Sequence, residues 1–399
     1  MNIKRRTLKN GLRVVHLDLP ISSVSLVVSV GVGFRDESEE YLGVSHLLEH
    51  LLFDGTKSYP TEFSFSEAAE KLGGDINGST DEYCTSFELR TSKDDFLEAL
   101  KIISELVESP LLSKENVDKE KKVIRAEMLS KKDFFKKNPV KTVLYNYLDG
   151  FDQLDYLDKE IKALDSLTHE KVMTHFEKYY FPKNMVLGIV GNIDNPFEEI
   201  EKAFNKNKEF EVNRVIPKFI LPSANTERVL DKDEVSSIYF SWFGPGIFSS
   251  ERAVFEVAAK IISKGENGLM KAIRFDEGLA YEVDAFMNAD ERKGVFIVSV
   301  KTSKENMQKV ENIVKEKVEL VKSVSISEVE QAKKSVLAEN ILEMEEYLEL
   351  ARVISNTELY KEKTPFEGYF EEIKKVTDKD VKDFANKYLN GNFVLITSK

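Results

Sequence analysis

The sequence predicts an α+β protein built from two related halves. Its 399 residues are too many for one ordinary core and suit two domains of roughly 200 residues each. Strand-like and helix-like patterns alternate along the chain. A stretch of the first half, residues 167–179, also recurs in the second half as residues 376–388, at an offset of 209.

The first half contains most of the clear local patterns. Apolar and alternating patterns predict strands at residues 13–18 and 23–32, and a strand pair within 73–90. Helical periodicity predicts helices over residues 43–54, 93–107 and 114–132. Cys84 falls on the patterned strand pair, which favours a packing role for this thiol over a redox role.

The internal repeat gives the domain organisation. Thr168 matches Thr377 and Tyr179 matches Tyr388, and each copy is followed by an apolar strand pattern, at 185–190 and 393–397. Residues 26–33 likewise match 239–246, both being strands that end in a glycine-containing turn. Chance similarity between two amphipathic helices is the alternative, because helical patterns are forgiving.

The segment 213–226 is the predicted linker, since it carries Pro217 and Pro222 and shows little periodicity. We therefore expect a first domain over residues 1–212 and a second over 227–399. All five histidines lie in the first half. Any histidine–metal chemistry is expected there too.

Charge and cysteine content exclude several classes of protein. A formal net charge of -13 disfavours nucleic acid and anionic membranes as partners, because both are bound through clustered Lys and Arg. The single cysteine, Cys84, cannot form an internal disulfide, and the first residues lack the apolar core of a signal peptide. These observations favour a cytoplasmic location.

The chemistry is concentrated in the run Gly43-Val-Ser-His46-Leu-Leu-Glu49-His50. Two histidines four residues apart on a helix project from one face, which suits chelation of a metal. Glu49 lies close to the same face and can contact a water beside that metal. An isolated H-x-x-E-H on an ordinary helix, or a pair of satisfied core histidines, is the alternative interpretation.

A catalytic zinc needs three protein ligands and one open position. The helix predicted over residues 114–132 offers Glu120 and Glu127, seven residues apart and so on nearly one face. One of them can bind the metal while the other orients a histidine or the water. Spacing alone does not decide between them.

At this point the sequence resembles a known family. The following segments look like those of the pitrilysin, insulinase and mitochondrial processing peptidase family of inverted (HxxEH) zinc peptidases, over nearly the whole chain: Thr7-Leu-Lys-Asn-Gly-Leu-Arg13, Gly43 to Thr56, Glu120 to Met128, Gly73-Gly-Asp-Ile-Asn77, Tyr180-Phe-Pro-Lys-Asn184 and Arg274-Phe-Asp-Glu-Gly278-Leu-Ala-Tyr281.

The resemblance implies roles for the first half. His46, His50 and Glu127 match the zinc ligands, Glu49 matches the base that activates water, and Glu120 matches an acid just outside the ligand set. The implied cofactor is one Zn²⁺ per chain, although the residues do not distinguish zinc from cobalt or manganese.

The resemblance also implies residues that contact the substrate. Asn77, with Thr80, is placed at an edge strand along which an extended peptide lies by strand addition. Arg274 and Tyr281 match a pair that binds the peptide and stabilises the oxyanion. The glycine-rich stretch before Arg274 is thinned here, and Asp81-Glu-Tyr-Cys84 departs from the usual run. Both departures concern substrate preference and loop mobility.

The implied architecture is two homologous α/β-roll domains, each a mostly antiparallel sheet packed with helices, forming half of a clamshell. The implied activity is endoproteolysis of peptides or unfolded segments inside a chamber completed by a second copy, a homodimer. A heterodimer with an inactive relative is the competing assembly. A catalytically inactive structural subunit and a bare zinc-binding module are the competing functions.

Overall fold

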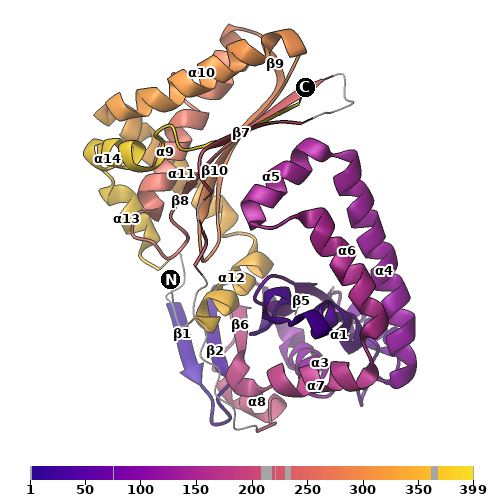
Figure 1. Cartoon of the computed structure of the whole chain (residues 1–399). Helices are drawn as coiled ribbons and strands as arrows, with labels where there is room; N and C mark the ends of the chain where they lie inside the picture. Colours follow the sequence, from indigo (N-terminus) through magenta and orange to yellow (C-terminus); the bar gives the residue numbers. More distant parts are fainter. Residues whose placement is uncertain are drawn as a thin grey trace. The chain divides into compact units, whose positions relative to one another are not determined.

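The computed structural model describes residues 2–74, 76–207, 218–220, 222–229, 235–360 and 367–398. Helices and two sheets confirm the α+β class (Figure 1). Contacts divide the chain into two units of three segments each: unit 1 is Met1–Lys131, Asp155–Val215 and Met344–Thr364, and unit 2 is Lys132–Leu154, Ile216–Glu343 and Pro365–Lys399.

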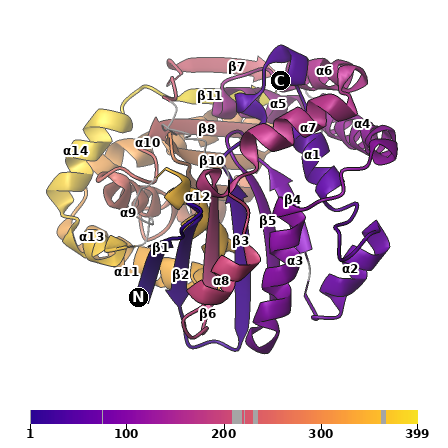
Figure 2. The same cartoon turned by 90° about the horizontal axis from the view of Figure 1, so that it is seen from below.

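Unit 1 contains a six-stranded sheet in the order β1-β2-β6-β3-β5-β4. Its strands are β1 (Asn2–Thr7), β2 (Arg13–Asp18), β3 (Ser23–Val30), β4 (Ile76–Thr80), β5 (Thr85–Ser92) and β6 (Met185–Gly191). The β2–β6 pair is parallel and the other neighbours are antiparallel. Figure 2 shows these strands from below. The central strands β3 and β6 are buried almost throughout, so helices must cover both faces of the sheet.

The helices of the first half confirm the predicted ones and add others. They are α1 (Val44–Leu52), α2 (Glu62–Glu70), α3 (Phe96–Glu108), α4 (Lys114–Lys137), α5 (Pro139–Asp149), α6 (Gln153–Ala163), α7 (His169–Tyr179) and α8 (Phe197–Ala203). The helix predicted over 114–132 continues for five more residues. It continues because no Gly or Pro interrupts the chain before Pro139, which begins α5.

One face of the six-stranded sheet of unit 1 is covered by α12 (Tyr347–Leu359), a helix from the far end of the chain. Gly188 of β6 makes this packing possible, since a Cβ there would lie 2.4 Å from the backbone oxygen of Ala351. The helix backbone therefore rests directly on the strand. Sequence periodicity did not predict that α12 packs on the unit 1 sheet.

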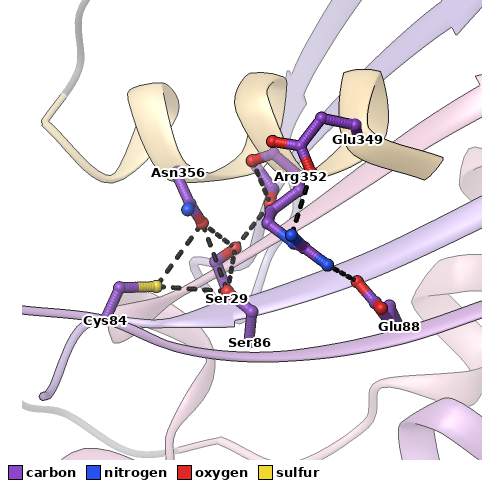
Figure 3. A network of polar contacts seen from close by, with 8 residues as sticks. Ser29, Cys84, Ser86, Glu88, Glu349, Arg352 and Asn356 are labelled. Carbon is purple, nitrogen blue, oxygen red and sulfur yellow. Dashed lines mark hydrogen bonds and ion pairs between the residues drawn. The ribbon is translucent and has the colours of Figure 1, made fainter. Parts of the chain in front are cut away.

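Polar side chains fill the space beneath α12 (Figure 3). The Asn356 amide oxygen accepts hydrogen bonds from Ser29 at 2.6 Å, Ser86 at 3.3 Å and Cys84 at 3.4 Å. Arg352, on the same helix, pairs with Glu88 of β5. Cys84 is buried just before β5, so its surroundings agree with the predicted packing role.

Unit 2 contains a five-stranded sheet in the order β7-β11-β8-β10-β9. Its strands are β7 (Asn225–Val229), β8 (Ser236–Gly244), β9 (Ala280–Ala289), β10 (Gly294–Thr302) and β11 (Val394–Ser398). One face packs on α9 (Arg252–Ser263), α10 (Met307–Leu320), α11 (Ile326–Glu343), α13 (Tyr369–Lys375) and α14 (Asp378–Tyr388). On the other face, Val140 and Leu144 of α5 join a second apolar cluster with β8, β10 and β11.

The predicted repeat corresponds to equivalent elements in the two units. Helices α7 and α14 both begin after a threonine, Thr168 or Thr377, whose hydroxyl caps the first turn. Each helix leads into a strand of its sheet. Strand β6 lies between β2 and the central β3, and strand β11 lies in the same way between β7 and the central β8. The linker at 213–226 stays a prediction, because residues 213–217 and 221, including Pro217, lie outside the described residues. Among the described helices, none combines the length and apolarity needed to cross a bilayer.

Candidate metal centre

Helix α1 carries the H-x-x-E-H run, and the half-buried carboxylate of Glu37 fixes where the helix begins. Gly43 precedes the helix in the left-handed region, at φ 84°. Both oxygens of Glu37 accept backbone hydrogen bonds there, from Gly43 at 2.6 Å and Ser45 at 2.7 Å. Four fully buried leucines then hold the helix against the core: Leu47, Leu48, Leu51 and Leu52. The predicted helix and its apolar surroundings are confirmed.

Three side chains converge on one point beside this helix. Glu127 Oε2, from α4, lies 3.6 Å from His46 Nε2 and 3.7 Å from His50 Nε2. One atom from each side chain can be chosen so that all lie within 4.8 Å of one another. Bonds of about 2.0–2.1 Å at tetrahedral angles place zinc ligands roughly 3.3 Å apart. Two imidazoles and a carboxylate at these separations therefore fit a zinc ion with little rearrangement.

Glu120 orients one of the two imidazoles. Its Oε2 lies 3.2 Å from His50 Nδ1, the ring nitrogen that does not face Glu127, while its Oε1 pairs with Lys119 at 3.3 Å. A carboxylate on the far nitrogen fixes the tautomer and ring angle of a metal-binding histidine. Of the two glutamates left open by spacing, Glu127 stands at the convergence point and Glu120 stands behind His50.

The protonation states of His46 and Glu127 suit a cation, whereas His50 would have to release a proton to bind one. Burial lowers the pKa of His46 to about 4, so this imidazole is neutral at pH 7. Burial also acts to lower the pKa of His50, but contact with Glu127 and the nearby charge of Glu49 outweigh it and raise the pKa. Contact with His50 lowers the pKa of Glu127. Neutral imidazole and ionised carboxylate are the forms that bind metal.

Glu49 is buried beside this point, between α1 and strand β4. Burial raises the pKa of Glu49, and a hydrogen bond from Thr80 Oγ1 to Oε2, at 2.7 Å, offsets part of the shift. Gly78 leaves room for the carboxylate, because a Cβ there would lie 2.9 Å from Glu49 Oε1. A buried carboxylate with a raised pKa is suited to accept and return a proton near neutral pH.

The predicted edge strand is β4, which pairs only with β5 among the described strands. Thr80 and Gly78 lie on its face toward α1, so alternation places exposed Asn77 on the opposite face. The structure thus brings Thr80 to Glu49, a contact that the sequence did not predict. The substrate roles of Asn77 and Thr80 stay predictions.

Arg274 and Tyr281 both belong to unit 2. Arg274 is exposed on the π-helix Met270–Asp276, and Tyr281 is 74% exposed near the start of β9. Exposed side chains of this kind are available to a ligand. Their roles in binding peptide and oxyanion stay predictions.

Two acids near the start of α1, the half-buried Glu37 and the buried Glu160, were missed. Burial raises the pKa of Glu37 to about 7, against the effect of its backbone hydrogen bonds to Ser45 and Gly43. Burial and the neighbouring Glu37 raise the pKa of Glu160 to about 8. Glu160 lies beside Gly43, where a Cβ would meet its Cγ at 3.2 Å. No spacing rule connects these positions, because Glu160 belongs to α6 and meets α1 only in the folded chain.

Known proteins resemble this chain along its whole length. Residues 13–145 match the family model described as Insulinase (Peptidase family M16), and residues 166–336 match that of the Peptidase M16 inactive domain. An uncharacterised zinc protease of Rickettsia felis is 26% identical over 97% of this chain and 95% of its own length. Mitochondrial-processing peptidase subunit beta of Dictyostelium discoideum is 23% identical over 97% of this chain and 86% of its own length.

Solved structures share the fold. A protease from Helicobacter pylori superposes with a TM-score of 0.81 at 21% identity, covering 100% of this chain and 99% of that one. A protein from Pseudomonas fluorescens titled peptidase M16 inactive domain gives a TM-score of 0.83 at 19% identity, covering 100% and 98%. Together with the two family models and the sequence relatives, these matches identify the chain as a member of peptidase family M16, the insulinase family that its motifs resemble.

Proposed function

We propose that this protein is a zinc-dependent endopeptidase that cleaves peptides or unfolded polypeptide segments. One observation carries the proposal: His46, His50 and Glu127 converge while Glu49 is held separately beside them. A bare metal-binding module has no use for a buried, hydrogen-bonded Glu49. The names of the relatives, zinc protease and processing peptidase, support the same chemistry.

The ligand set defines what a bound ion would do. His46, His50 and Glu127 would hold Zn²⁺ and leave one corner of its tetrahedron open, as catalytic zinc sites do. When bound, zinc polarises a carbonyl oxygen and lowers the pKa of water toward ~7. Glu120 holds the His50 ring through Nδ1, so it would contribute to the affinity for an ion without binding the ion itself.

Glu49 supplies the proton transfers. Its carboxylate accepts a proton from the attacking water, and then gives the proton to the leaving amine as the peptide bond breaks. Burial keeps its pKa raised, which favours returning the proton. Proton transfer by a positioned side chain contributes about 10²–10⁴-fold to rate.

The remaining roles belong to the same proposal. The open edge of β4 would pair with an extended peptide, next to Asn77. Arg274 and Tyr281 would bind the peptide and stabilise the oxyanion, with a homodimer completing the chamber. The proposed location is the cytoplasm, on the basis of the single buried Cys84. Light scattering tests the assembly, and a strictly monomeric enzyme that still cleaves peptides would overturn the dimer chamber.

The decisive experiment compares Glu49→Gln with His46→Ala. Glu49→Gln removes the proton acceptor and keeps the ligands, so we expect full zinc content by metal analysis and no cleavage of a peptide library. His46→Ala should lose zinc as well as activity. Turnover by metal-replete Glu49→Gln would reject the assigned base, and zinc-independent cleavage by the wild type would reject the whole proposal.

A further inference from the structure

Strand β4 is attached to unit 1 on one side only. Its five residues pair with β5 from Ile76↔Leu89 to Thr80↔Thr85, and no described strand pairs with its other edge. Short strands at the edge of a sheet belong to the least stable parts of a fold, because few contacts hold them. A second strand added at the free edge would order β4.

The face of β4 toward α1 is shaped around the Glu49 carboxylate. Gly78 lies where any Cβ would come within 2.9 Å of Glu49 Oε1. Thr80, two residues on and therefore on the same face, donates its hydroxyl to Glu49 Oε2 at 2.7 Å. Within the described residues, Thr80 provides the hydrogen bond that Glu49 accepts. The position of this carboxylate therefore depends on β4 as well as on its own helix.

We propose that Thr80 is a positioning residue for Glu49, and that β4 transmits occupation of its free edge by a peptide to the placement of this carboxylate. The inference rests on the proposed peptidase function. A peptide paired along β4 fixes the strand, the fixed strand fixes Thr80, and Thr80 fixes Glu49 Oε2. A peptide too short to pair along β4 leaves the strand and Thr80 less ordered.

This coupling makes a kinetic prediction. Binding energy from residues distant from the cleaved bond should appear in kcat, because it orders the group that moves the proton. Peptides that share one cleavable bond should therefore be turned over faster as they lengthen along β4. If a peptide only pairs with β4 and Thr80 does not position Glu49, longer peptides should have a lower KM and an unchanged kcat.

The variants follow from the two faces of β4. Thr80→Val keeps the shape and strand preference of the side chain and removes the hydroxyl. Thr80→Ser keeps the hydroxyl. Ser79→Ala removes a hydroxyl from the neighbouring position, on the opposite face, and is the matched control.

For a long peptide, Thr80→Val should lower kcat by about 10- to 100-fold, the usual worth of a hydrogen bond to a charged group. Its kcat should approach the wild-type value for short peptides, and KM and zinc affinity should change by less than about threefold. Thr80→Ser should restore most of kcat, and Ser79→Ala should match the wild type. A Thr80→Val enzyme with wild-type kcat and length dependence would overturn the inference.

A second measurement does not require turnover. Hydrogen exchange of the β4 amides is compared in Glu49→Gln protein with and without a saturating long peptide. Protection of residues 76–80 on binding supports the coupling, and unchanged exchange there overturns it. If wild-type enzyme cleaves no peptide at all, the proposed function fails instead, and the exchange result still decides whether a bound peptide orders β4.

Discussion

The two sheets have the same design, yet they carry different chemistry. Unit 1 orders its strands β2-β6-β3-β5-β4, with β1 added outside, and unit 2 orders them β7-β11-β8-β10-β9. In each sheet the first of these pairs is parallel and the others are antiparallel. The helix after the central strand β3 is α1, and the helix after β8 is α9. Within the described residues, histidine and glutamate converge on a possible ion only in unit 1.

The two units differ in the side chains that contact the carboxylates of their long helices, α4 in unit 1 and α11 in unit 2. In unit 1, Glu120 and Glu127 of α4 face the imidazoles of α1. In unit 2, Glu339 of α11 pairs with Lys260 of α9 and, at 3.2 Å, with Lys264. Ammonium groups of the chain itself thus neutralise the carboxylate in unit 2. The same scaffold thus carries a candidate metal site in one unit and a set of ion pairs in the other, depending on a few side chains.

In each unit, one face of the sheet is covered by a helix from the other half of the sequence. Helix α12, from the second half of the sequence, packs on β3 and β6 of unit 1, and α5, from the first half, packs on the unit 2 sheet. In each half, the helix that packs on the other half's sheet is the one that follows the long helix: α5 follows α4, and α12 follows α11. This exchange explains why each unit consists of three segments.

The largest expected effect tests the metal difference directly. Glu127→Gln replaces a charged ligand by a neutral amide, so we expect zinc affinity to fall by more than about 100-fold and peptide cleavage to be lost. Glu339→Gln is the matched change in unit 2. It should leave zinc affinity, measured by competition with a chelator, at the wild-type value. Equal losses of affinity in both variants would contradict a metal centre confined to unit 1.

A second prediction concerns the helix exchanged onto unit 1. Gly188→Ala forces a methyl group against the backbone of Ala351, which cannot retreat without lifting α12 from the sheet. We expect the free energy of unfolding to fall by about 3 kcal/mol, at the upper end for overpacked cores. Gly391→Ala is the control, because nothing lies within 4 Å of its added Cβ. Urea unfolding measures the stability of both variants. Similar unfolding midpoints for the two would show that the close packing of α12 on β6 is unimportant.

The sequence predicted what depends on local spacing. The four-residue spacing of His46 and His50 on a leucine-rich helix, and the seven-residue spacing of Glu120 and Glu127, are properties of single helices. The family resemblance chose Glu127 as the ligand, and the structure places it at the point of convergence.

Contacts between distant segments were beyond these rules. The periodicity of α5 and α12 shows that each has an apolar face but not which sheet it covers. The hydrogen bond from Thr80 to Glu49 and the capping of α1 by Glu37 join residues that no helix or strand period connects. The sequence accordingly supplied the candidate metal ligands and Glu120 behind His50, and missed Thr80 and Glu37, which act through contacts between distant segments.

A third prediction contrasts one acid of each unit, Glu160 and Asp290, through the pH dependence of stability. The pKa of Glu160 is raised to about 8, chiefly by burial, so the folded protein keeps a proton that the unfolded chain releases above about pH 4.5. Its favourable contribution is complete below pH 4.5 and is lost as pH rises through 8. Glu160→Gln should remove the part of this slope that comes from Glu160 and raise stability at pH 8, because the folded protein then no longer buries an ionising carboxyl there.

Asp290 of unit 2 should behave in the opposite sense. Burial acts to raise its pKa, but Lys293 and Arg292 outweigh burial and lower it. The stability that Asp290 contributes is therefore present above pH 3.8 and is lost as pH falls. Asp290→Asn should flatten the acid side of the stability profile, where Glu160→Gln flattens the alkaline side. Guanidinium unfolding at a series of pH values measures both, and identical profiles would contradict the assignment.

The smallest effect separates the two copies of the repeat. Thr168 caps α7 through one hydrogen bond, from the Lys171 amide at 3.3 Å. Thr377 caps α14 through the Asp380 amide at 3.2 Å, and Asp380 accepts in return from the Thr377 amide at 2.9 Å. Because Thr377→Ala breaks one side of a reciprocal box, it should cost about 1–2 kcal/mol, against about 0.5–1 kcal/mol for Thr168→Ala. Thermal unfolding of the two alanine variants measures the difference, and Thr→Ser replacements, which keep the capping oxygen, should recover most of it. A larger loss for Thr168→Ala would mean that packing around α7, and not the cap, distinguishes the two copies.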